Sequence, residues 1–188
     1  MTLNNMTPIT IFGLDNVNYP KYRNELIDLY SLSFTEGRYA QHIDPQAIEI
    51  SLDDIMSIGF GFMSFDKDTL IGAVICLALK NDPDFPFDLH KDIQPDKTLY
   101  IADLMVDQNH RGKGVALGLI EHLFELSKSK PYTDAVIRVW NENIPALSLY
   151  KKLGFVEIDM ISQTKISKEK KEPFEMKKIY MHRKIIEN

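Results

Sequence analysis

A chain of 188 residues with 44% hydrophobic and 26% charged residues is long enough for one domain with its own core, and this composition excludes a disordered protein. Its formal net charge of −5 argues against bulk nucleic-acid binding, which favours basic surfaces. Cys76 is the only cysteine, so an internal disulfide is excluded, and its apolar surroundings predict a buried thiol. We therefore expect a single domain over residues 1–188.

The sequence shows neither a signal peptide nor a membrane-spanning helix. Residues 1–10 lack the basic region and long apolar run of a signal peptide. No apolar stretch approaches the about 18 residues that a membrane-spanning helix requires. The expectation is a cytoplasmic protein without membrane contact.

The first half of the chain predicts two helices between strands. Tyr22, Leu26, Leu29 and Tyr30 recur at helical spacing, and Asp44-Pro45 is a good helix start because the carboxylate can cap free N–H groups. In chain order we expect a strand over 9–14, a helix from 20 to about 34, a polar loop over 36–43, a helix from 45, and hairpin strands over 60–65 and 70–79.

The second half predicts a long surface loop over 81–97, a strand over 99–106, a turn over 107–112 and an amphipathic helix through residues 116–124. A strand over 135–140, a short helix from Asn143 to Gly154, and a final hairpin of strands over 155–164 and 174–185 follow. This order predicts a layered α/β fold whose mixed, largely antiparallel sheet is flanked by helices.

A glycine-rich turn stands between the strand over 99–106 and the amphipathic helix. Its residues are Arg111, Gly112, Lys113, Gly114, Val115 and Ala116. Glycines leave backbone N–H groups accessible, and a helix N-terminus favours anions, so this segment predicts a pyrophosphate cradle. It is not a P-loop, because no Lys-Ser or Lys-Thr follows Gly114, and its spacing fits a dinucleotide fingerprint poorly. Taken alone, it could also be a glycine-rich turn with solvated charges.

A second motif follows the next strand: Asn143, Ala146, Tyr150, Gly154 and Phe155, spaced as Asn-x-x-Ala-x-x-x-Tyr-x-x-x-Gly-Phe. Together with Leu104-Met105-Val106 and Arg111-x-x-Gly114-x-Ala116, this pattern resembles the GNAT superfamily of N-acetyltransferases. The resemblance covers roughly residues 98–158, and its one departure is Ala116, where glycine is commoner.

The resemblance implies a GNAT fold in which two central strands, here 99–106 and 135–140, splay apart to admit acetyl-CoA. It implies that the pantetheine arm pairs with the backbone of Met105 and Val106, and that the pyrophosphate meets the N–H groups of residues 111–116. A backbone N–H near Leu104 or Met105 would stabilise the oxyanion. Asn143 would contact pantetheine, or would only cap its helix.

Direct attack of an amine on a thioester needs a proton acceptor for the amine and a proton donor for the leaving thiolate. The resemblance makes Tyr150 the donor, although a packing role is the alternative. Asp103 is the candidate base, because it is a carboxylate within an apolar strand, on the face expected to hold Ile101 and Met105.

Other polar residues are alternatives. Glu36, His42 and Asp44 lie between the first two helices, where the family usually forms its substrate site, and Asp44 is also a helix cap. Lys151 and Lys152 could reach the ribose phosphate or form a solvated helix face.

We therefore expect an enzyme that acetylates a primary amine of an unidentified small molecule or protein, without a metal. The alternative is a catalytically inactive coenzyme A-binding sensor or partner module of the same fold. A homodimer remains open.

Overall fold

A computed structural model describes residues 9–35 and 41–185. Its elements in chain order are β1 (Thr10–Leu14), α1 (Tyr19–Thr35), α2 (Pro45–Ile58), β2 (Phe60–Asp66), β3 (Thr69–Ala78), the 3-10 turn η1 (Leu79–Asn81), β4 (Thr98–Val106), the 3-10 turn η2 (Gln108–His110), α3 (Val115–Ser127), β5 (Asp134–Trp140), α4 (Ile144–Lys152), β6 (Val156–Ile166) and β7 (Pro173–Lys184). The predicted order of strands and helices is confirmed.

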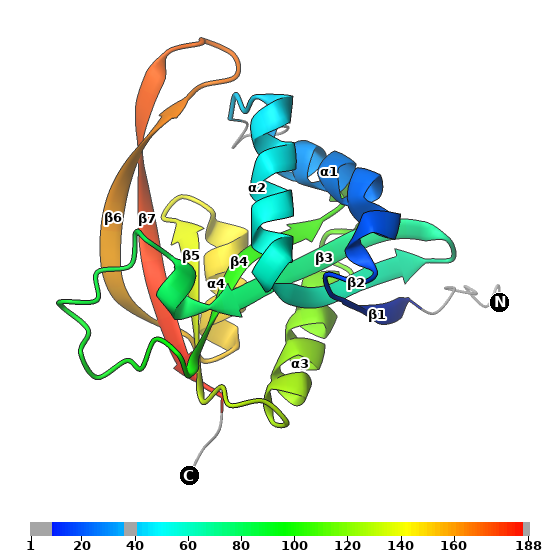
Figure 1. Cartoon of the computed structure of the whole chain (residues 1–188). Coiled ribbons are helices and arrows are strands. Elements are labelled where there is room, and N and C mark those ends of the chain that lie inside the picture. The colour runs from blue at the N-terminus through cyan, green and yellow to red at the C-terminus, as the bar shows by residue number, and fades with distance from the viewer. Residues whose placement is uncertain (1–8, 36–40, 186–188) are drawn as a thin grey trace, which may run out of the picture.

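All the strands join one sheet in the order β1-β2-β3-β4-β5-β7-β6 (Figure 1). Neighbouring strands are antiparallel, except that β4 and β5 run parallel. The predicted mixed, largely antiparallel sheet is therefore confirmed. The β6–β7 hairpin is long and curves beyond the rest of the sheet (Figure 1).

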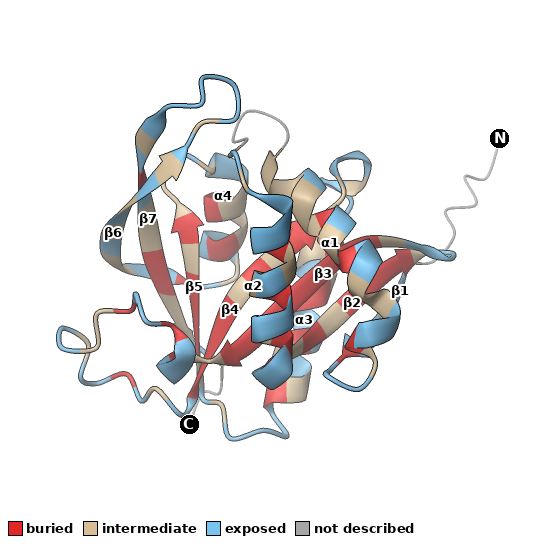
Figure 2. Cartoon of the chain, turned by 45° about the horizontal axis from the view of Figure 1, so that its top comes forward, coloured by how far each residue is buried: buried red, intermediate tan, exposed pale blue. Residues whose placement is uncertain are grey.

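Helices cover both faces of the sheet, and the buried residues lie between the layers (Figure 2). On one face, α1 and α2 bury Leu26, Leu52 and Met56 against β2, β3 and β4. On the other face, α3 and α4 pack Leu119 and Leu147 against the opposite side of the sheet. Each helix contributes the apolar stripe that its 3.6-residue period predicts.

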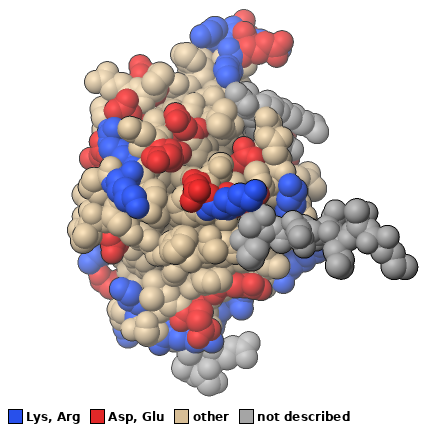
Figure 3. Space-filling model, turned by 90° about the vertical axis from the view of Figure 1, so that its right-hand side faces the viewer, with Lys and Arg blue, Asp and Glu red and all other residues tan. Residues whose placement is uncertain are grey.

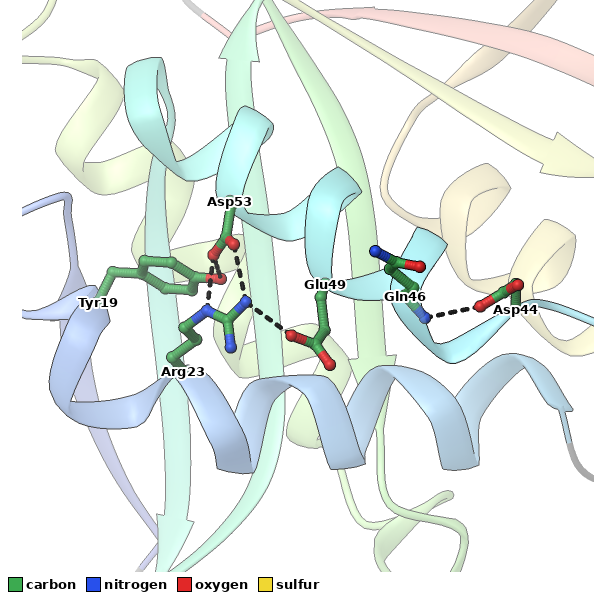
Figure 4. A network of polar contacts seen from close by, with 6 residues as sticks. All are labelled: Tyr19, Arg23, Asp44, Gln46, Glu49 and Asp53. Carbon is green, nitrogen blue, oxygen red and sulfur yellow. Dashed lines mark hydrogen bonds and ion pairs between the residues drawn. The ribbon is translucent and has the colours of Figure 1, made fainter.

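Helices α1 and α2 are joined by a polar cluster that centres on Arg23 (Figure 4). Its Nε donates to Asp53 Oδ1 at 2.8 Å, and its Nη2 donates to Asp53 Oδ2 at 2.7 Å and to Glu49 Oε2 at 3.0 Å. The Tyr19 hydroxyl also donates to Asp53, at 2.8 Å. This forked pairing fixes how the two helices lie against each other.

Asp44 caps α2 as predicted, since its side chain accepts the N–H of Gln46 at 2.8 Å (Figure 4).

On the face drawn in Figure 3, Lys and Arg side chains are interspersed with Asp and Glu, in keeping with the modest net charge of −5.

The prediction that 81–97 is only a surface loop is wrong in part. Phe85 and Ile93 are buried in a third core cluster, where Phe85 packs edge-on against Tyr180 with ring centroids 5.1 Å apart. The Tyr180 hydroxyl donates to the buried Asp82 at 2.7 Å. The loop is therefore tied to β7 by apolar and polar contacts.

Candidate active site

The central feature of the sheet is the gap between β4 and β5. Their parallel pairing runs only from Thr98↔Asp134 to Ile101↔Ile137, although both strands continue further. The β5-facing backbone of residues 102–106 is consequently left without a strand partner. A cleft of about 1500 Å³ opens there, and its walls come from α1, α2, β4, α3, β5, α4 and the β6–β7 hairpin. The splayed central strands are confirmed.

The glycine-rich turn leads from the end of β4 into α3. Gly112 and Gly114 have φ values of 73° and 84°, in the left-handed region that glycine adopts without strain. Both residues line the cleft. Among the described residues, none of the N–H groups of residues 112–117 donates a hydrogen bond. Unpaired donors at a helix N-terminus suit a phosphate group, so this segment fits the pyrophosphate of acetyl-CoA.

Side chains hold this turn against β4. The Nε of Arg111 donates to the carbonyl of Val106 at 3.1 Å. The ring of His110 lies 2.8 Å from Asp107 Oδ1, and the same oxygen accepts the N–H of Asn109 at 3.0 Å. The cradle is therefore fixed by contacts within the protein.

The other predicted cradle residues differ in exposure. Lys113 is exposed and lies outside the cleft lining, whereas Val115 and Ala116 both line the cleft, Val115 with its side chain largely buried in the core. On β4, Leu104 and Val106 line the cleft, whereas the Met105 side chain is fully buried beneath α1 and α2. Only the backbone of Met105 can therefore serve a ligand.

Asp103 lies on β4 next to a β-bulge. Ile75 pairs with Asp103, but the next residue, Cys76, pairs with Ile101, so Ala102 is an extra residue. The bulge reverses the side-chain alternation of the strand. Ile101 faces α3, whereas Met105 faces α1 and α2. The prediction that Ile101, Asp103 and Met105 share one face is thus wrong for Ile101.

The Asp103 carboxyl is 9% exposed and lines the cleft. Burial raises its pKa to about 6, although the positive charges of Lys178 and Arg138 oppose the shift. Asp103 in turn raises the pKa of the Tyr30 hydroxyl on α1. At pH 7 a carboxylate with this pKa is mostly ionised, and its pKa is close enough to 7 for it to accept a proton from a substrate.

Tyr150 lines the same cleft from α4. It is 6% exposed, its ring packs edge-on against Phe155 at 6.0 Å, and burial raises the pKa of its hydroxyl. The hydroxyl therefore stays protonated at neutral pH. Asn143 also lines the cleft and caps α4, accepting the N–H of Ala146 at 3.4 Å.

Only some of the alternative candidate residues line the cleft. His42, Asp44 and Lys152 line the cleft. Lys151 does not, and its ammonium pairs with Glu157 at 2.8 Å. Glu36 lies outside the described residues.

Several charged residues that line the cleft were not predicted from the sequence. Arg138 and Lys178 occupy core-facing positions, between Val136 and Trp140 on β5 and between Met176 and Tyr180 on β7, and Lys165 joins them from β6. A lysine or arginine in the apolar phase of a strand is the same signal that singled out Asp103.

The model of the acetyltransferase (GNAT) family matches residues 23–155, which include β4, the cradle, α3, β5 and α4. The chain belongs to the GNAT family of acetyltransferases. This match confirms the resemblance carried by the two motifs.

Two curated relatives illustrate the similarity. N-alpha-acetyltransferase 30 of Schizosaccharomyces pombe is 32% identical over 98 residues, which cover 51% of this chain and 57% of that protein. Human N-acetyltransferase 8B is 33% identical over 60 residues, 32% of this chain and 26% of that protein. The matches thus span little more than half of one relative and about a quarter of the other.

Solved structures extend the fold similarity over nearly the whole chain. An N-acetyltransferase from Staphylococcus aureus Mu50 superposes with a TM-score of 0.69 and 15% identity, over 95% of this chain and 99% of that one. The putative acetyltransferase yncA from Salmonella typhimurium, solved with its cofactor acetyl-CoA, gives a TM-score of 0.68 and 14% identity, over 96% of each chain. At this identity the likeness concerns the fold.

No group of three or more His, Cys, Asp and Glu side chains within residues 9–35 and 41–185 is arranged to hold a metal ion. No helix in the same ranges is long and apolar enough to cross a membrane.

Proposed function

We propose that this protein transfers the acetyl group of acetyl-CoA to a primary amine. In this reaction the amine nitrogen bonds to the acetyl carbon and the carbon–sulfur bond breaks, so one proton must leave the nitrogen and one must reach the sulfur. The observation that carries the proposal is the cleft itself, whose lining brings together the unpaired N–H donors of a helix N-terminus, Asp103 and Tyr150.

The residues divide into binding and proton-transfer roles. The N–H groups of residues 112–117 bind the pyrophosphate, and the backbone of Met105 and Val106, which has no strand partner on the β5 side, pairs with the pantetheine arm as an added strand would. Leu104 and Asn143 line the same channel. Arg111 acts mainly by anchoring the turn to β4.

Asp103 accepts the proton that the amine nitrogen must lose, because burial places its pKa near 6, within reach of neutral pH. Tyr150 donates a proton to the leaving sulfur, because its hydroxyl is protonated at neutral pH and lines the cleft. The two groups belong to different faces of the sheet, so each can serve a different side of the reacting bond.

The experiment combines calorimetric titration with acetyl-CoA and mass spectrometry of an amine panel incubated with the protein and acetyl-CoA. Binding of acetyl-CoA together with an acetylated amine supports the proposal. Absence of binding would refute the assignment of the cleft.

A further inference from the structure

Strands β5, β7 and β6 form a wall of the cleft on the side of the sheet that α1 and α2 cover. On β7, Lys178 pairs in register with Trp140 of β5 on one side and with Ile161 of β6 on the other. Gln163 and Lys165 follow Ile161 at alternate positions of β6, so they share its face of the sheet. Lys178 therefore lies in the middle of this wall, and Lys165 lies towards the hairpin tip.

The charges on this wall are not balanced. Arg138 is neutralised, because its Nη1 lies 2.6 Å from Asp84 Oδ2 and 3.7 Å from Asp82 Oδ1. By contrast, the ammonium groups of Lys165 and Lys178 have no ion pair or hydrogen-bonded partner within residues 9–35 and 41–185. Both line the cleft.

A positive charge on Lys178 is costly in this position. The pKa of Lys178 is lowered to about 8, chiefly by burial and also by the charges of Arg138 and Lys165, while the carboxylates of Asp103 and Asp84 oppose the shift. Lys178 remains mostly cationic at pH 7. A half-buried cation without an ion-pair partner favours an anion in the adjoining space.

Asp103 lies across the cleft from these lysines. β4 and β7 flank β5, which places their backbones about 10 Å apart where the strands are paired. Asp103 and Lys178 make no ion pair with each other, although each shifts the pKa of the other. The space between them is thus bounded by a carboxylate on one side and ammonium groups on the other.

We propose that Lys165 and Lys178 form an anion subsite in the amine-binding half of the cleft, and that the acceptor is an amine that also carries a carboxylate, such as a free amino acid. The subsite rests on the proposed acetyl transfer. The ammonium of the acceptor lies towards Asp103, and its carboxylate lies towards the lysines. The phosphate-binding turn begins α3 on the opposite face of the sheet, so the two anion-binding regions are distinct.

The test compares amino acids with their carboxamides, which lack the negative charge, as acceptors for wild type and for Lys178→Met and Lys165→Met. An acid and its carboxamide also differ in amine pKa, so the decisive quantity is their ratio of kcat/KM in a variant relative to that ratio in wild type. Lys177→Met is the matched control, since Lys177 is exposed on the other face of β7.

Lys178→Met should lower kcat/KM for acids about 10- to 100-fold, mainly through KM, and change that for carboxamides less than about threefold. Lys165→Met should act in the same direction, and the control should match wild type. Methionine removes a partly buried charge and is only one heavy atom shorter than lysine, so the melting temperature of Lys178→Met should stay equal or rise.

Equal losses for acids and carboxamides, or unchanged rates for both, would overturn the subsite and leave acetyl transfer intact. A wild type that acetylates only amines without an anionic group would do the same. No acetylated product from either class would overturn the proposed function and the subsite with it.

Discussion

Asp103 and Tyr150 line one cleft from opposite faces of the sheet. Tyr150 belongs to the core beneath α3 and α4, whereas Asp103 follows the bulge at Ala102 and turns towards α1. They can meet in one cavity because β4 and β5 stop pairing after Ile101 and Ile137. This relationship places a proton acceptor and a proton donor on either side of the gap.

The cradle predicts that Gly114→Glu abolishes acetyl-CoA binding, because Gly114 has a φ of 84° and the new carboxylate would repel the pyrophosphate. Calorimetric titration measures this, and circular dichroism checks the fold. Gly118→Ala is the control, since Gly118 lies within α3, does not line the cleft and has room for a methyl group. Wild-type affinity in folded Gly114→Glu would remove the cradle assignment.

The Tyr150 hydroxyl predicts that Tyr150→Phe lowers kcat about 10²- to 10⁴-fold while acetyl-CoA affinity changes little, because only the proton donor is lost. Steady-state rates and titration measure the two quantities. Tyr132→Phe, outside the cleft, should behave as wild type. A Tyr150→Phe variant with normal turnover would reduce Tyr150 to a packing residue.

The pKa of Asp103 predicts a pH–rate profile. In wild type, kcat/KM should fall below about pH 6 as the carboxylate is protonated. Asp103→Asn should lower turnover about 10²-fold or more at pH 7, and the loss should shrink at higher pH, where more of the amine is already neutral. Superimposable profiles for the two proteins would show that the base lies elsewhere, with His42 the next candidate.

The same substitution predicts a gain in stability. Folding raises the pKa of Asp103 to about 6. The contribution of this residue to the free energy of unfolding is therefore fully present below the unfolded pKa of about 4 and is lost as pH rises through about 6. Asp103→Asn should therefore match wild type near pH 4 and exceed it by about 2–3 kcal/mol at pH 7. Melting curves at both pH values test this, and a destabilised variant at pH 7 would contradict the burial of an ionised carboxylate.

For Asp53 we expect stability to depend on pH in the opposite direction. Its hydrogen bonds from Arg23 hold the pKa of this carboxyl below its ordinary value, so its contribution is present above the unfolded pKa of about 4 and is lost as pH falls through the lowered value. Asp53→Asn should lower the melting temperature at pH 7 and have a smaller effect at acid pH. An equal decrease at every pH would show that the α1–α2 contact depends on shape and not on charge.

The sequence predicted the elements because their signals are local. The 3.6-residue stripe of α1 and the Asp44 cap of α2 act within a few residues, and the glycine spacing around Gly114 is itself a motif. The bulge at Ala102 could not be predicted, since a single extra residue leaves no mark in composition. The same holds for the buried Phe85, whose partner Tyr180 is far along the chain.

The most direct test of acetyl transfer in this cleft is the release of coenzyme A thiol from acetyl-CoA in the presence of an amine panel, measured for wild type, Asp103→Asn and Tyr150→Phe. The account predicts release that requires an amine and that falls at least about 10²-fold in either variant at pH 7. Acetyl-CoA that binds tightly without amine-dependent thiol release, in wild type and variants alike, would contradict it and indicate a coenzyme A-binding protein without catalysis.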